Sequence, residues 1–134
     1  AVSAALAPDH LNDLRKSGLT DDTIARCQFE SVRPHDIKVK GAESAYRLPY
    51  FDLAGKKNSL ERIKLFPPVK RKDGTQKYHQ APDTAPSLYL APLLDWGTIA
   101  QVNSPLSITE GEKKAAALAQ HRTQTHIQRA FVEK

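Results

Sequence analysis

The chain has no methionine, a single cysteine and a single tryptophan among its 134 residues, and it contains no long apolar run. A lone Cys27 excludes an internal disulfide and a zinc ribbon, because both need several thiolates. The apolar runs fall far short of the roughly 20 residues that a membrane helix requires. We therefore expect a cytoplasmic protein with no membrane partner, in which Cys27 is a small buried residue.

Basic residues are concentrated in the middle of the chain. The formal net charge is +5, and residues 55–80 contain eight Lys or Arg against only two Asp or Glu, whereas the flanking segments are nearly balanced. Such a concentration favours contact with a polyanion, because phosphates that are neutralised on binding release counterions. The structural alternative is a solvated hairpin face, which is the usual place of lysines.

Residues 8–29 have the pattern of a helical hairpin. Pro8 suits the first turn of a helix, and Gly18 suits a helix end. Thr20 is a favourable N-cap for a second short helix. Apolar residues recur at helical spacing along both segments, which predicts that the pair packs against a core. Its charge is too balanced to favour a DNA-reading helix-turn-helix.

Alternating apolar and polar residues predict short antiparallel strands in the middle of the chain. The candidate strands are residues 45–51, 60–66, 76–79 and 87–90, the last being either a strand or a buried lead-in. Pro67-Pro68 is expected to end the second strand, because proline cannot donate to a ladder. Trp96, farther along, is expected in the core.

A strand-turn-helix unit is expected near the end of the chain. Leu106 to Thr109 has a strand pattern, Glu110-Gly111 a turn, and residues 112–120 favour helix, with at best a short terminal helix beyond. The whole chain is therefore expected to be α+β. We expect three segments: a helical hairpin and loop at 1–44, a basic β-rich subdomain at 45–104, and the strand-turn-helix with its tail at 105–134.

The turn of the last unit resembles the first motif of TOPRIM domains, the catalytic fold shared by bacterial-type primases and topoisomerases. The similar residues are Ile108-Thr109-Glu110-Gly111-Glu112-Lys113-Lys114-Ala115, which look closest to primase-like proteins of phages and mobile elements. Upstream segments are similar, in order and spacing, to the part of a primase core that precedes TOPRIM. These segments are residues 14–24, 47–55, 73–78 and 87–90.

The resemblance implies a DNA replication protein that guides single-stranded DNA toward a magnesium-dependent site for joining nucleotides. Glu110 matches the family's catalytic glutamate, which acts beside the metal. The Asp-x-Asp motif that would hold Mg²⁺ is absent, and Glu112 is not expected to point the same way as Glu110. We therefore expect an incomplete catalytic and metal site at Glu110, with Mg²⁺ bound only in a complete protein and no cofactor in this chain alone.

Eight residues are candidates for contact with nucleic acid. Arg62 and Lys64 lie two apart, hence on one face of a strand, and Lys77 adjoins Tyr78, a side chain able to stack on bases. The full set is Arg47, Arg62, Lys64, Lys70, Arg71, Lys72, Lys77 and Tyr78. We expect these residues to follow phosphates without reading base sequence.

Three functions remain open on the sequence alone. The leading hypothesis is a catalytically incomplete segment of a primase-like protein that binds single-stranded DNA through residues 55–80, beside a helicase or another replication protein. The first alternative is a magnesium-dependent primase, a nucleotidyltransferase, when the missing acidic motif is supplied. The second is a noncatalytic interaction module of a mobile element, which binds a protein partner and no DNA.

Overall fold

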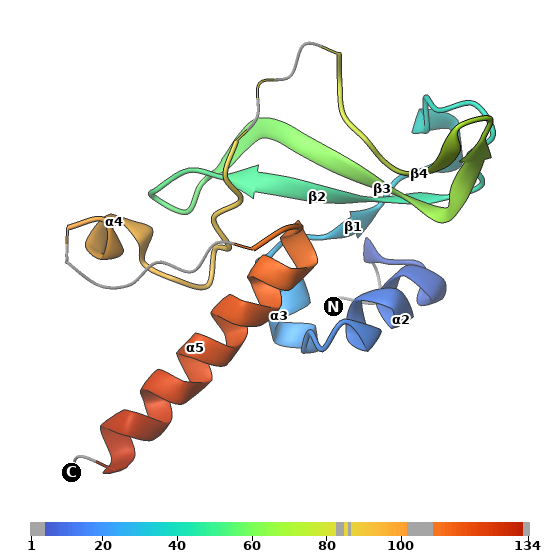
Figure 1. Ribbon diagram of the computed structural model, residues 1–134. Coiled ribbons are helices and arrows are strands. Elements are labelled where there is room, and N and C mark those ends of the chain that lie inside the picture. The colour runs from blue at the N-terminus through green and yellow to red at the C-terminus, as the bar shows by residue number, and fades with distance from the viewer. Residues whose placement is uncertain (1–4, 83–84, 86, 102–108, 133–134) are drawn as a thin grey trace.

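Helices pack on one side of a four-stranded antiparallel sheet (Figure 1). The computed structural model describes residues 5–82, 85, 87–101 and 109–132, with side chains as far as residue 122. The mixture of helices and an antiparallel sheet is the α+β class expected from the sequence. Within this part of the chain, no helix combines the length and the apolar character that crossing a bilayer requires.

The N-terminal helical hairpin forms as predicted. Helix α2 spans Pro8–Lys16 and helix α3 spans Asp21–Arg26. The backbone N–H of Thr23 donates to Oγ1 of Thr20 at 3.2 Å, which caps α3. Gly18 has a φ of 87°, in the left-handed region that favours glycine after a helix. Local signals therefore set the bounds of both helices.

The sheet has the strand order β1-β2-β3-β4, and every neighbouring pair is antiparallel. Its strands are β1 (Glu30–Ser31), β2 (Ala45–Phe51), β3 (Lys57–Arg71) and β4 (Gly74–His79). The strands expected at the positions of β2 and β4 are confirmed. Leu48 pairs with Arg62 and Tyr46 with Lys64, so these basic residues of β3 share the sheet face that the helices cover.

Strand β3 is longer than expected, because Pro67 and Pro68 do not end it. The strand continues to Arg71, with a shift of register against β4 between Lys64 and Val69. Both prolines are exposed and lie within this irregular stretch, where no residue of β3 pairs with β4. The prediction that the prolines close the strand was wrong, since an irregularity accommodates residues that cannot donate to the ladder.

The segment after β4 is mostly without regular structure. No strand forms at residues 87–90, and the alternative of a buried lead-in holds only in part, because Tyr89 is half-buried whereas Leu88 is 64% exposed. Trp96 begins the short helix α4 (Trp96–Ile99), and its Nε1 donates to the carbonyl oxygen of Ala91 at 2.7 Å. The indole is only half-buried, so its expected place in the core was wrong.

Helix α5 spans Glu112–Val132 without interruption. The expected helix ended near residue 120 and was followed by a short terminal one, and that prediction was wrong. No glycine or proline follows Gly111, so the sequence holds no strong helix breaker once α5 has begun. The strand expected before it spans residues 106–109, of which 106–108 lie outside the described part of the chain.

The main core joins segments that are far apart in sequence. Leu14 of α2, Ile24 of α3, Leu48 of β2 and Ala116 of α5 belong to one buried cluster. Cys27 is fully buried in the same cluster, as predicted. A smaller cluster on the other face of the sheet consists of Val32, Ala45, Leu65 and Val69.

Candidate nucleic-acid interface

The β3–β4 hairpin and the loop before β2 both carry exposed lysines. We call this surface the basic tip, and its members are Lys38, Lys40, Lys70, Lys72 and Lys77. Arg71 joins the two segments, because its Nη2 donates to the carbonyl oxygen of Lys40 at 2.9 Å while Nε and Nη2 donate to the Gln76 side chain. The loop and the hairpin are thereby held side by side.

Strand alternation places Lys70 and Lys77 on one face of the hairpin. Lys70 pairs with Thr75, and Lys77 follows two residues later on β4. None of the five lysines of the basic tip takes part in an ion pair within the described residues. Asp73, in the turn of the hairpin, and Glu43, in the loop before β2, offset only two of these charges. The tip therefore presents net positive charge to solvent.

Three of the predicted nucleic-acid contacts pair with carboxylates within the protein instead. The pairs are Arg47 with Glu30 and Glu61, Arg62 with Glu112, and Lys64 with Asp13, at N–O distances of 3.1–3.5 Å. Arg62 and Lys64 do share a strand face, as predicted, but the helices cover that face. Only 30% of the Arg62 side chain and 13% of the Lys64 side chain is exposed. A phosphate would have to compete with a carboxylate for either cation.

Tyr78 lies beneath the guanidinium of Arg62, whose Cζ is 4.1 Å from the centre of the ring. At this distance the cation is attracted to the face of the aromatic ring. The tyrosine is also half-buried. Arg62 therefore occupies the ring face on which a base would stack, and Tyr78 belongs with Arg62 and not with the basic tip.

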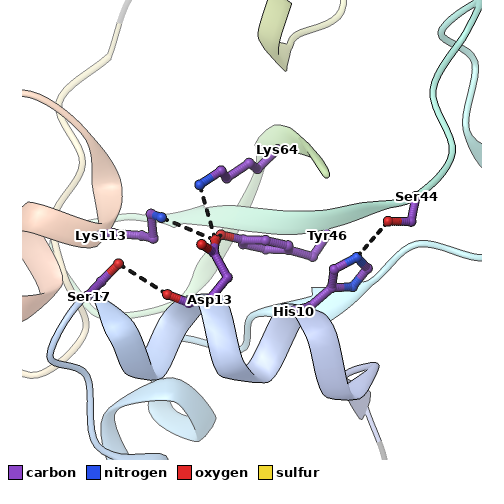
Figure 2. A network of polar contacts seen from close by, with 7 residues as sticks. All are labelled: His10, Asp13, Ser17, Ser44, Tyr46, Lys64 and Lys113. Carbon is purple, nitrogen blue, oxygen red and sulfur yellow. Dashed lines mark hydrogen bonds and ion pairs between the residues drawn. The ribbon is translucent and has the colours of Figure 1, made fainter. Parts of the chain in front are cut away.

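Asp13 of α2 receives three donors on one carboxylate oxygen (Figure 2). Oδ2 accepts from the hydroxyl of Tyr46 at 2.7 Å, from Nζ of Lys64 at 3.1 Å and from Nζ of Lys113 at 3.3 Å. Burial alone would raise the pKa of Asp13, but these hydrogen bonds and charges hold it below its ordinary value. Burial, together with the neighbouring Lys64, lowers the pKa of Lys113. The network fixes α2 and α5 on the sheet.

Glu112 is the acidic residue that the sequence prediction missed. It is 1% exposed, accepts from the hydroxyl of Tyr50 at 2.6 Å and pairs with Arg62 at 3.1 Å. A signal was present in the sequence, because Glu112, Ala116 and Ala119 recur at the spacing of one helix face. All three are buried.

Glu110 stands apart from these networks. It is exposed just before α5, whereas Glu112 is buried, so the two carboxylates point different ways, as expected. Within the described residues, no group of three or more His, Cys, Asp or Glu is placed to hold a metal ion. A single exposed carboxylate does not fit Mg²⁺, which needs several oxygen ligands at fixed geometry. No catalytic step follows from Glu110 in this arrangement.

No family model, curated protein or solved structure matches the chain. The arrangement of the described residues is therefore the basis for a proposal about function.

The chemistry open to the basic tip is the binding of anions. Ammonium groups on a fixed hairpin attract phosphates as point charges, without the planar recognition that a guanidinium provides. The guanidinium of Arg71, which lies between these lysines in sequence, is engaged with Lys40 and Gln76. The tip can therefore hold a phosphate backbone, and it has no group that would select one base over another.

Proposed function

We propose that the chain binds single-stranded DNA through the basic tip, as part of a primase-like replication protein. The observation that carries the proposal is the group of five exposed lysines without an acidic partner in the described residues. Each ammonium can approach a phosphate and release a condensed counterion, which supplies essentially all of the free energy of nonspecific binding.

The choice of a single strand follows from the resemblance. Primase-like proteins act on unpaired template, and residues 73–78, which resemble part of a primase core, form most of the second half of the tip hairpin. A flexible strand can also bend around the end of a hairpin, whereas duplex DNA is stiff over such distances.

Neutralising the basic tip should weaken binding and reduce its dependence on salt. Lys70, Lys72 and Lys77 are changed together to Gln, and binding to a labelled oligothymidylate is measured by fluorescence anisotropy at several salt concentrations. The slope of log K against log salt should fall in magnitude by about 2, because each lost phosphate contact on a single strand removes about 0.7.

A matched control carries the same change of charge elsewhere. Lys16, Lys56 and Lys57 are exposed lysines outside the tip, and their joint change to Gln should leave the slope close to that of the parent protein. An equal loss in both triple variants would show that net charge alone governs binding. That result, or a parent protein that fails to bind at low salt, would overturn the proposal.

A further inference from the structure

A cavity of about 240 Å³ lies between α5, the segment that leads into α4 and the paired strands β2 and β3. Its apolar and aromatic walls are formed by Tyr50, Leu88, Tyr89, Leu94, Trp96 and Leu118. The volume exceeds the cavity of about 150 Å³ that holds a benzene molecule, and it is below the roughly 300 Å³ at which drug-sized sites begin. A compound with a single ring therefore fits.

One face of α5 forms the helical wall of this cavity. Glu112, Ala115, Ala119 and Arg122 all line it, and they recur at the spacing of one helix face. Long side chains on a helix lean toward its N-terminus, so Arg122 reaches back over the preceding turn. The wall is thus apolar in its middle and charged at both ends.

The charged residues at the two ends of the wall differ in whether an opposite charge pairs with them. Glu112 is neutralised by Arg62 at 3.1 Å and receives the hydroxyl of Tyr50 at 2.6 Å. Arg122 is half-buried and has no ion pair within the described residues. A guanidinium at the edge of an apolar cavity matches the planar geometry of a carboxylate, which can accept two parallel hydrogen bonds.

We infer that this cavity binds a small apolar carboxylic acid. The ring or short hydrocarbon body lies among Leu94, Trp96 and Leu118, and the carboxylate lies on Arg122. No lysine of the basic tip lines the cavity. The site is therefore separate from the proposed DNA-binding surface, and it stands whether or not that surface binds DNA.

The single tryptophan gives a direct measure of occupancy, because Trp96 lines the cavity. Phenylacetate is transparent where tryptophan is excited, and its addition should change the emission of Trp96 to saturation. Phenylacetamide has the same shape without the charge. It should bind about tenfold more weakly, because a hydrogen bond to a charged partner contributes about that factor.

Two variants separate the charge from the cavity. Arg122→Gln should weaken phenylacetate about tenfold and leave phenylacetamide unchanged. Ala115→Leu places extra methyl groups against the cavity and should weaken both compounds. Lys72→Gln removes one positive charge from the basic tip and should leave the affinity for both compounds unchanged. Thermal denaturation confirms that each variant is folded.

Three results would overturn the inference. The first is no saturable change in Trp96 emission with phenylacetate. The second is equal affinity for phenylacetate and phenylacetamide, and the third is an Arg122→Gln variant that binds phenylacetate as the parent does. The site would be established if the parent and Lys72→Gln both bind phenylacetate more tightly than phenylacetamide and Arg122→Gln does not.

Discussion

Asp13 shows how much one side chain can organise in this protein. Its Oδ2 accepts from Tyr46, Lys64 and Lys113, which come from β2, β3 and α5. Only 19% of the Asp13 side chain is exposed, so solvent screens these contacts less than it screens a surface pair. The carboxylate therefore compensates two lysines that would otherwise repel each other beneath the helices.

The contribution of Asp13 to stability should be lost at low pH. Its folded-state pKa lies below the ordinary value of 3.8, so the contribution is fully present above 3.8 and disappears as pH falls through the folded pKa. Asp13→Asn should therefore lower the urea midpoint at neutral pH, and its difference from the parent should shrink below about pH 4.

Urea denaturation followed by circular dichroism at a series of pH values measures this difference. Glu43→Gln, which neutralises an exposed carboxylate in the loop before β2, serves as the control, and its midpoint should stay close to that of the parent across the series. A difference between parent and Asp13→Asn that is as large in strong acid as at neutral pH would contradict the assignment.

The sequence predicted the strand face on which a residue lies more readily than the contacts that the residue makes. Arg62 and Lys64 were correctly placed on one strand face, but nothing local shows that helices cover that face. Glu110 was favoured over Glu112 by its position in a motif. The buried glutamate could have been found only by extending the helix pattern through Ala116.

At the scale of elements, those with clear local signals were predicted and those that depend on distant contacts were not. Helix α2 begins at Pro8, and α3 begins after the capping residue Thr20. Strand β2 forms where Tyr46, Leu48 and Tyr50 recur at every second position. The continuation of β3 past Pro67-Pro68 depends on an irregularity that the sequence does not reveal. The basic tip was found in part, because Lys40 joins it through a tertiary contact with Arg71.

Helix α5 should be sensitive to bulk on its buried face. Ala116 is fully buried in the main core, so Ala116→Leu should lower the free energy of unfolding by about 1–3 kcal/mol through overpacking. Ala25 is exposed on α3, and Ala25→Leu should change stability little. Urea denaturation of the two variants measures the contrast, and equal effects would show that α5 does not pack as described.

At the scale of the whole molecule, the helical hairpin, the sheet and α5 share one core. Residues from all three segments expected from the sequence meet there, including Leu14, Leu48 and Ala116. Such sharing could not be derived from the sequence, because hydrophobic periodicity identifies an apolar face without naming its partner. A protein built in this way should lose its elements together.

Cys27 offers a test of that cooperativity. It is fully buried at the end of α3, and burial raises the pKa of its thiol to about 11. The native protein should therefore react very slowly with an aromatic disulfide reagent near neutral pH, because the thiolate is the reactive form. Reactivity should appear at the same urea concentration at which circular dichroism is lost. Reaction at clearly lower urea would show that the helical hairpin opens by itself.

Arg71 also determines how the basic tip would receive a ligand. Its hydrogen bonds to the carbonyl oxygen of Lys40 and to Gln76 hold the loop against the hairpin in the absence of DNA. Ordering a loose loop costs about 1–2 kcal/mol for each residue fixed, and here that cost is met during folding. The backbone of the basic tip is already ordered before binding. The conformational entropy lost on binding is therefore mainly that of the single-stranded DNA and of the lysine side chains.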